Sequence, residues 1–280
     1  MQQSFEVQGP IDLDVRLAAG GIEVDASADG NATVELIAHD EESERLVEAA
    51  RVELSTHGAR PTLLIDVPQK RSFGITTIFG RGGIECRIRC PQGSALDVRT
   101  KSADVTVRGT LGSLAVATAS GDVEVDRVSG DVSVKSASSD VSAREVGGTT
   151  SIQTASGDID IEVARGRVNV TSVSGDITIG EAYDDVSANS VSGDQDHRAV
   201  MQGAVSAHSV SGDVTIGVRR GSKAHLDCTT VSGETSSELE LSSEAPSGDG
   251  PFVDVRAKTV SGDIRITRAS APSNTQEVHA

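Results

Sequence analysis

The sequence predicts an all-β fold, a β-solenoid built from 18-residue coils that contain two short strands each. Three observations predict it: a Ser-Gly-Asp triplet that recurs at a fixed interval, apolar residues that alternate with polar ones, and very few aromatic residues. The 280 residues include four Phe, one Tyr and no Trp, while 36% of them are hydrophobic. The hydrophobic residues are mostly small or branched, and branched aliphatic side chains favour strands.

The triplet marks one corner of each coil, with variants in three copies: Ser102-Ala103-Asp104, Ser138-Ser139-Asp140 and Ser232-Gly233-Glu234. Its third, acidic position recurs through the last two-thirds of the chain, at Asp104, Asp122, Asp140, Asp158, Asp176, Asp194, Asp213, Glu234 and Asp263. Subtracting successive numbers gives 18 for each of the first five intervals, then 19, 21 and 29. A short fixed period is typical of a solenoid, in which each coil stacks on its copy. The alternatives are an up-and-down meander and a β-sandwich, whose turn signals do not require such identity between copies.

Positions one period apart carry similar side chains, which predicts columns that pack inward. One column holds Val116, Val134, Ile152 and Val170, and another holds Val123, Val141, Ile159 and Ile177. Alternation with a period of two indicates that one face of each strand is buried. We expect a third column to pack inward in the same way, formed by Ala119, Ala137, Ala155, Val173, Val191 and Val210.

The first hundred residues are less repetitive and predict a mixed, β-rich cap. Its strands are expected at 11–17, 22–24, 34–36, 52–54, 63–67, 84–88 and 96–98. A turn at Ala19-Gly20-Gly21 is expected to separate the first two. The segment 40–50 is the one helix candidate, because Asp40 can act as its N-cap and Val47 belongs to a short apolar stripe.

These patterns divide the chain into three parts. We expect a capping part with one helix over residues 1–94 and a solenoid of Ser-Gly-Asp repeats over 95–268. A loop rich in Ser, Glu, Gly and Pro at 236–251 interrupts the solenoid. Residues 269–280 are expected to form a flexible tail.

Charge and composition exclude several classes of protein. The formal net charge is −17, and an acidic chain repels phosphate backbones, so nucleic acid is not an expected partner. The chain has no apolar run long enough to cross a membrane and no basic and apolar leader, which predicts a cytoplasmic protein. Three cysteines without CxxC spacing, Cys86, Cys90 and Cys228, fit a reducing compartment and no disulfide framework.

The acidic corners allow two interpretations. Gly permits a sharp turn, and Ser and Asp bond to nearby backbone groups, so the triplet is explained by corner chemistry alone. The alternative is a ladder of carboxylates that binds Ca²⁺, with candidate ligands Asp122, Asp140, Asp158, Asp176, Asp194 and Asp213. Calcium rolls use an 18-residue coil with two equivalent turns. Here the second turn differs and the full calcium-binding motif is absent. No other cofactor is predicted.

The coil after Asp194 departs from the pattern. Gln195 and His197 occupy columns that hold Val, Ile or Ala in the preceding copies, and one extra residue follows. A bulged coil explains this departure. The alternative is a polar site formed by Asp194, Asp196 and His197, although these residues lack a recognised metal-ligand spacing.

The segment 69–83 combines apolar and basic residues. It contains Phe73, Ile75, Ile78 and Phe79, flanked by Lys70, Arg71 and Arg81. One interpretation is a hairpin loop that folds back over the core. The other is an exposed apolar tip with a basic rim, which suits a protein partner or peripheral contact with an anionic lipid surface.

The repeats, together with two further segments, resemble a known family. Strands that begin Ser-Gly-Asp-(Val/Ile), the lead-in 9–15 (GPIDLDV) and the segment 90–98 (CPQGSALDV) are similar to the bacterial DUF4097 family of "putative adhesin" or "toastrack" repeat proteins. The resemblance covers nearly the whole chain and implies the repeat fold. It also implies a link to cell-envelope stress systems or adhesion, with envelope association as the alternative location, and it supplies no catalytic residues.

Three classes of function follow. The first is a non-catalytic scaffold or interaction protein with an unknown protein partner, which also allows self-association through the solenoid ends. The second is the calcium-binding ladder. The third is an enzyme acting on polysaccharides, whose chemistry needs a basic residue beside the acids. The candidates for that residue lie in turn regions: Arg165, Arg167, Arg219, Arg220 and Lys223.

Overall fold

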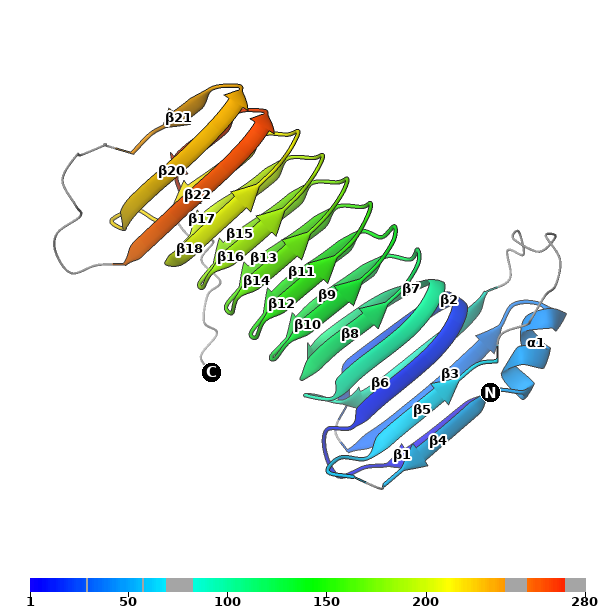
Figure 1. Cartoon of the computed structure of the whole chain (residues 1–280). Helices are drawn as coiled ribbons and strands as arrows, with labels where there is room; N and C mark the ends of the chain where they lie inside the picture. Colours follow the sequence, from blue (N-terminus) through cyan, green and yellow to red (C-terminus); the bar gives the residue numbers. More distant parts are fainter. Residues whose placement is uncertain (29, 57, 69–82, 240–250, 270–280) are drawn as a thin grey trace. The chain divides into compact units, whose positions relative to one another are not determined.

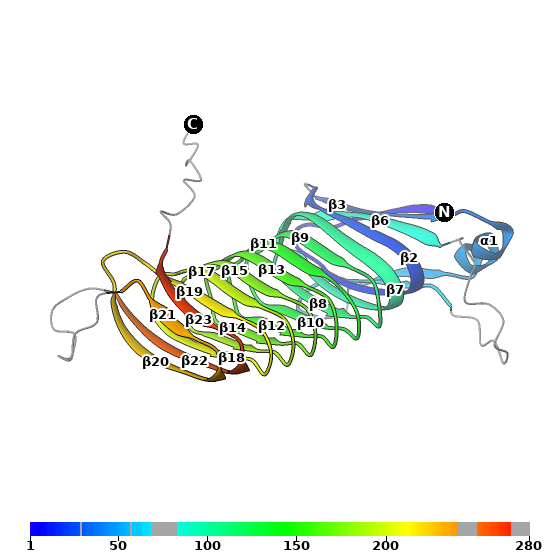
Figure 2. The same cartoon turned by 90° about the horizontal axis from the view of Figure 1, so that it is seen from above.

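The computed structural model describes residues 1–28, 30–56, 58–68, 83–239 and 251–269 (Figures 1 and 2). It is almost entirely β, and its repeating part is a coil of parallel strands, so the predicted all-β solenoid is confirmed. The chain forms two compact units, Met1–Ile159 and Asp160–Ala280. The predicted boundaries at residues 94 and 269 stay predictions.

The first unit begins with five strands and one helix that precede the repeats. They are β1 (Gln2–Glu6), β2 (Asp12–Ala28), β3 (Asn31–Ala38), α1 (Glu41–Glu48), β4 (Arg51–Ser55) and β5 (Thr62–Asp66). β6 (Ile84–Pro91) then leads to β7 (Ala95–Leu111). β1 and β6 flank β3 in antiparallel pairs, and β4 pairs antiparallel with β5.

β2 differs from the prediction because one strand of 17 residues replaces two strands and a turn. Its first half pairs with β5, its second half pairs with β6, and β7 follows it in parallel from Asp12–Ala95 to Ala26–Gly109. The bend falls at Gly20, whose φ of +124° favours glycine. A Cβ there would lie 2.1 Å from the Ile84 carbonyl oxygen. The strand therefore turns the corner of a coil without a loop.

The predicted helix is present and slightly shorter than expected. Asp40 caps it, and its Oδ1 accepts a hydrogen bond of 2.7 Å from the Ser43 backbone N–H. Ser43 and Val47 are buried, four residues apart on one face. Ala49 ends the helix, so residue 50 lies outside it.

Regular 18-residue coils complete the first unit. Their strands are β8 (Ser113–Ala117), β9 (Val123–Val128), β10 (Val132–Lys135), β11 (Val141–Val146) and β12 (Thr150–Gln153). β8, β10 and β12 stack in parallel, so that Val116, Val134 and Ile152 are register neighbours, as predicted. β9 and β11 stack likewise, with Val123 beside Val141. These column residues are buried, and the core is therefore a set of aliphatic stacks.

The second unit continues the repeat. Its strands are β13 (Ile159–Ala164, which begins at the boundary), β14 (Val168–Thr171), β15 (Ile177–Ala182), β16 (Val186–Asn189), β17 (Gln195–Val200), β18 (Gly203–His208) and β19 (Val214–Val218). The register between β17 and β19 shifts after His197, which confirms the predicted bulge. β20 (Lys223–Ser232), β21 (Thr235–Ser237), β22 (Phe252–Ser261) and β23 (Ile264–Arg268) complete it.

The last two coils are exchanged in space relative to their order in the sequence. β22 pairs in parallel with β18 on one side and with β20 on the other, so the coil made last lies between two earlier ones. β23 lies between β19 and β21 in the same way. The terminal rung, defined as β20 and β21, is therefore followed in the chain by the rung that it stacks on.

The third predicted column is wrong in its direction. Ala119, Ala137 and Ala155 are not among the buried residues of the core, and Val173, Val191 and Val210 are exposed. The strand alternation explains the error, because Val170 points inward and the inward position two residues later is Ser172. The buried hydroxyl of Ser172 donates to the Ser174 carbonyl oxygen at 3.1 Å, and the valine after it points to solvent.

Candidate interaction surfaces

The acidic corners form ladders of hydrogen bonds between successive rungs. The Asp122 Oδ1 accepts from the Asp140 backbone N–H at 3.0 Å, and the Asp140 Oδ1 accepts from the Asp158 N–H at 2.8 Å. In the second unit Asp176, Asp194, Asp213 and Asp263 each accept at 2.8 Å from the acidic residue of the next rung, which ends the ladder at Glu234. Each bond satisfies a backbone donor that the strands leave unpaired at the corner.

This geometry accounts for the acids without a cation. The described residues contain no group of three His, Cys, Asp or Glu side chains placed to hold a metal ion. The six candidate ligands Asp122, Asp140, Asp158, Asp176, Asp194 and Asp213 lie at successive corners, and each supplies one carboxylate. The corner interpretation is therefore the one that the hydrogen bonds explain.

The polar site predicted after Asp194 is not assembled. Asp194 belongs to the ladder, while Asp196 pairs with the Arg198 guanidinium at 3.3 Å on the outer face. His197 points into the core between Ile179 and Ile216. Because the three side chains diverge, they form no common site.

His197 is instead a polar residue in an apolar column. It is fully buried, and neither ring nitrogen has a hydrogen-bond partner. Burial lowers the pKa of its imidazole to about 4, so the ring is neutral at pH 7. Its neighbour Gln195 is buried too, but its Nε2 donates to the Ser190 Oγ and the His208 carbonyl oxygen, both at 2.9 Å.

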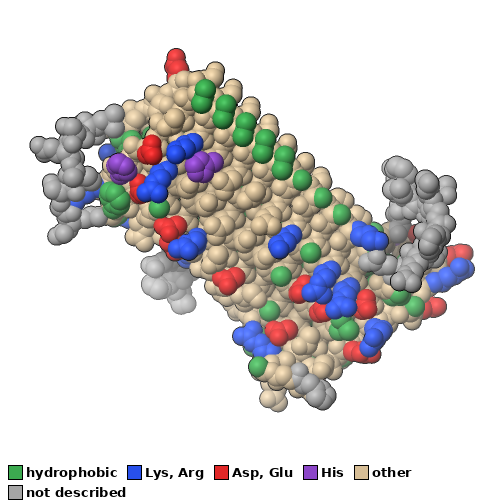
Figure 3. Space-filling model, viewed as in Figure 1, with side chains coloured by type: hydrophobic (Ala, Val, Ile, Leu, Met, Phe, Trp, Pro, Cys, Tyr) green, Lys and Arg blue, Asp and Glu red, His purple; other side chains and the backbone are tan. Residues whose placement is uncertain are grey.

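The exposed valines form a row along one corner of the second unit. This valine row consists of Val173, Val191, Val210, Val260 and Val231, in spatial order. Four of them are 48–50% exposed, and Val231 on the terminal rung is 78% exposed. Figure 3 shows hydrophobic side chains aligned along this corner. The ladder acids follow three residues after each valine, so an apolar line and an acidic line run together.

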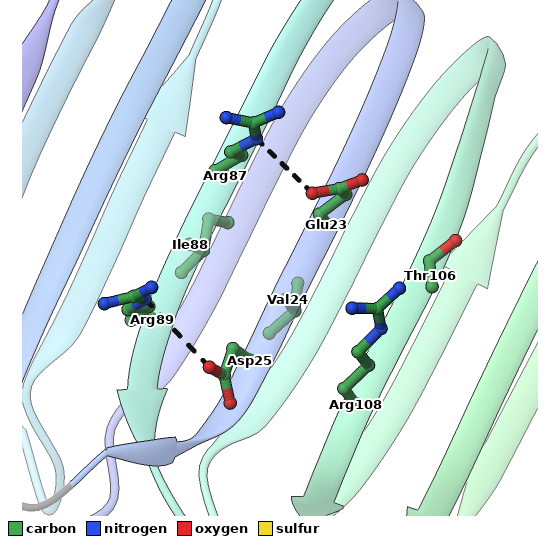
Figure 4. Close-up of a pocket in the computed structure, with 8 residues that line it drawn as sticks. All are labelled: Glu23, Val24, Asp25, Arg87, Ile88, Arg89, Thr106 and Arg108. Atoms are coloured by element: carbon green, nitrogen blue, oxygen red, sulfur yellow. Dashed lines mark ion pairs between the residues drawn. The ribbon is translucent and has the colours of Figure 1, made fainter.

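The first unit has a different surface, in which charges alternate between strands. A pocket of about 170 Å³ lies on β6, β2 and β7 (Figure 4). Arg87 pairs with Glu23 across the strands at 3.4 Å, and Arg89 pairs with Asp25 at 4.0 Å. Exposed pairs of this kind contribute about 0–1 kcal/mol each. Arg108 lines the pocket as well, so three arginines and two carboxylates surround it.

The basic residues considered for catalysis lie apart from the ladder acids. Arg165 lies over the Tyr183 ring, 5.3 Å from its centroid, and Arg167 pairs with Asp185 at 3.2 Å. Arg219 and Arg220 are exposed at the turn before β20. Lys223 follows them at the start of β20, where its backbone N–H donates to Pro251.

The remaining partner candidates, Phe73, Ile75, Ile78 and Phe79, lie outside the described residues, and their role stays a prediction. The cysteines are free thiols, as expected. Burial raises the pKa of Cys86 to about 12 and that of Cys90 to about 11, which keeps both protonated. The described residues contain one helix, α1, and its eight residues are too few to cross a membrane.

The exposure of the valine row was not predicted from the sequence. The signal was available, because counting by twos from Val170 places Val173 outside. Similar side-chain volume at each repeat does not distinguish an inward column from an outward one, because inward and outward positions recur at the same interval.

A search of curated proteins found no match. Similar solved structures include a "putative adhesin" from Bacteroides fragilis, which is 14% identical over 95% of this chain and 96% of that one, with a TM-score of 0.44. A "putative lipid binding protein" from Parabacteroides distasonis is 13% identical over 96% of both chains, with a TM-score of 0.41.

A third similar structure is a "putative cell adhesion protein" from Clostridium sporogenes, which is 11% identical over 96% of this chain and 99% of that one, with a TM-score of 0.28. The family model described as "Toastrack DUF4097" matches residues 11–267. That match spans both units and includes every Ser-Gly-Asp corner. The chain therefore belongs to the Toastrack DUF4097 family.

Proposed function

We propose that this chain is a non-catalytic interaction protein that binds a protein partner through the valine row. The single observation that carries the proposal is this line of half-exposed valines on rigid, hydrogen-bonded rungs. Apolar side chains that repeat at strand spacing form a surface that is already ordered before binding. Binding a partner there therefore costs little conformational entropy of this chain.

The acidic line beside the valines indicates the chemistry of the partner. Asp176, Asp194 and Asp213 are exposed, and each uses one oxygen in the ladder. A complementary surface has an apolar strip and basic residues along one side of it. The net charge of −17 attracts such a partner from a distance.

Family membership extends the proposal to adhesion or envelope stress in a bacterial cell. Similar structures are described as "putative" adhesins, which fits a binding role. We propose a cytoplasmic location, with association at the envelope as the alternative. Fractionation of native cells with detection of the chain tests the location, and recovery in the membrane fraction would favour the alternative.

The experiment compares three forms of the full chain as bait in native-cell extracts. The first is the natural chain, the second carries Val173→Ser, Val191→Ser and Val210→Ser, and the third carries the matched control Ala119→Ser, Ala137→Ser and Ala155→Ser. We expect a protein that the first and third recover and the second loses. Binding of the purified partner should weaken about tenfold or more with the valine variant.

Equal recovery by all three baits would contradict the proposal. So would equal affinity of the purified partner for the natural chain and the valine variant. Because the valines are exposed, their substitution should leave the melting temperature nearly unchanged, and this separates lost binding from lost folding.

A further inference from the structure

The terminal rung leaves a strand edge unpaired among the described residues. β20 pairs with β22 on one side, and within the described ranges no strand pairs with its other side. The Lys223 backbone N–H donates to the Pro251 carbonyl oxygen at 3.0 Å. The backbone N–H and C=O groups of the odd-numbered residues of β20 therefore point toward β22. The backbone groups of the alternate residues point toward the unpaired edge, and these residues are Ala224, Leu226, Cys228 and Thr230. Their backbone groups form a ready template for another strand.

The core is also open at this rung. Val253, Val255 and Ala257 of β22 are fully buried. Their register neighbours on β20 are Ala224, Leu226 and Cys228, which are only half-buried. The difference arises because β22 is covered on both sides and β20 on one side, so the apolar stacks end without a cover from the described residues.

We propose that the occupant of this edge is a second copy of the chain, paired β20 to β20 in antiparallel orientation about a two-fold axis at Leu226. A self-complementary strand edge is the simplest isologous interface. This proposal does not depend on the valine row.

Two constraints limit the register. Inward side chains must face inward side chains, and edge-facing backbone groups must face each other, so even-numbered residues must lie opposite even-numbered ones. An axis at Leu226 satisfies both constraints. It places Leu226 on its own copy and Ala224 on Cys228 of the other copy.

Charge then favours this register over its neighbours. His225 and Asp227 are exposed on the outer face. An axis at Leu226 places His225 of each copy opposite Asp227 of the other, so the interface contains this pair twice. An axis at Asp227 would oppose two carboxylates. An axis at His225 would set Cys228 against Ser222, leaving the apolar stack unmatched.

The edge carries no obstructing side chain on the second strand of the rung. β21 presents Thr235, Ser236 and Ser237, which are small and exposed, and it pairs with β23 on one side. A second rung can therefore approach both strands together. The expected interface is small, so we expect a reversible dimer rather than a permanent one.

Sedimentation and light scattering of the full chain over a wide range of concentrations test the proposal. We expect a monomer–dimer equilibrium with no larger assembly. His225→Asp keeps the rung's pairing and places two carboxylates opposite each other, and it should weaken the dimer about tenfold or more. Leu226→Lys should weaken it further, because it puts a charge at the axis.

Ser187→Lys is the matched control, since it adds the same charge at an outward position of the interior strand β16. It should leave dimerisation unchanged, as should the triple valine variant. The latter result separates this proposal from the proposed function. Hydrogen exchange of the Ala224, Leu226, Cys228 and Thr230 amides should be fast in the monomer and slow in the dimer.

A chain that stays monomeric at every concentration would overturn the proposal. A dimer that survives both His225→Asp and Leu226→Lys would do so too. Slow exchange of the four amides in the monomer would also overturn it, because residues of the same chain would then cover the edge.

Discussion

At the scale of single residues, His197 departs from the rule that columns are aliphatic. Its register neighbours are Ile179 and Ile216, so an imidazole with two unpartnered nitrogens lies between isoleucines. A buried polar group without a partner costs about 1–3 kcal/mol. The fold tolerates this cost because the neighbouring rungs are extensively hydrogen-bonded, and two predictions follow from it.

Replacing the imidazole by a side chain of similar volume should stabilise the protein. We expect His197→Ile to raise the free energy of unfolding by about 1–3 kcal/mol at pH 7, measured by urea denaturation. His39→Ile, at an exposed position outside the proposed dimer edge, is the control and should change it by less than about 0.5 kcal/mol. A destabilised His197→Ile protein would show that the imidazole has a partner.

The same residue makes stability depend on pH. The folded pKa is about 4 and the ordinary value is 6.5, so the unfolded chain takes up the proton first as pH falls. The stability from neutral His197 is complete above pH 6.5 and declines from there to about pH 4, by roughly 3 kcal/mol in all. His197→Ile should lack this loss, so the difference between the two proteins should grow between pH 7 and pH 4.5. An equal pH dependence in both would contradict the assignment.

At the scale of elements, the corner determines the coil. Most corners combine a glycine with positive φ, a hydroxyl residue before it and a carboxylate after it, and Ala103 and Ser139 replace the glycine in two of them. The glycine and the carboxylate could be read from the sequence as a repeated triplet. The residue between the hydroxyl and the triplet, such as Val173, points to solvent. Similar side-chain volume at this position in every repeat does not show that direction, so the valine row was wrongly predicted to pack inward.

The ladder predicts a cost for losing one carboxylate. Asp194→Ala leaves the Asp213 backbone N–H without its acceptor, and should lower the free energy of unfolding by about 1–2 kcal/mol. Asp160→Ala, on an exposed strand face, is the control and should have an effect below about 0.5 kcal/mol. Added Ca²⁺ should leave the melting temperature of the natural chain unchanged. A calcium-dependent rise that Asp194→Ala abolishes would restore the cation interpretation.

Two adjacent glycines test the bend in β2. A Cβ on Gly20 meets the Ile84 carbonyl oxygen at 2.1 Å with φ at +124°, so Gly20→Ala should cost more than about 2 kcal/mol. A Cβ on Gly21 meets nothing within 4 Å, so Gly21→Ala should be neutral or stabilise by about 0.4–1 kcal/mol. Thermal unfolding of the two variants measures the contrast. Equal melting temperatures would contradict the continuous strand.

At the scale of the molecule, the repeat could be predicted because one period encodes both strands and corners. The columns at Val116 and Val123 therefore identified the solenoid directly. The exchange of the last two rungs could not be predicted. Glu234 and Asp263 carry the same corner signal, and parallel stacking accepts either rung as the neighbour of Asp213. Because of this exchange, β20 rather than β22 has the edge that no strand of the described residues pairs with, so this edge too could be found only in the structure.

The exchanged rungs also determine the order in which the coils can stack during translation. Neighbouring corners earlier in the second unit are 18 or 19 residues apart, whereas Asp213 and Asp263 are 50 apart. A ribosome makes Glu234 29 residues before Asp263, the residue to which its backbone N–H bonds. Most rungs can therefore stack as they emerge, but the terminal one must wait for the chain that follows it. Completion of the second unit therefore waits until the chain through Asp263 has been made.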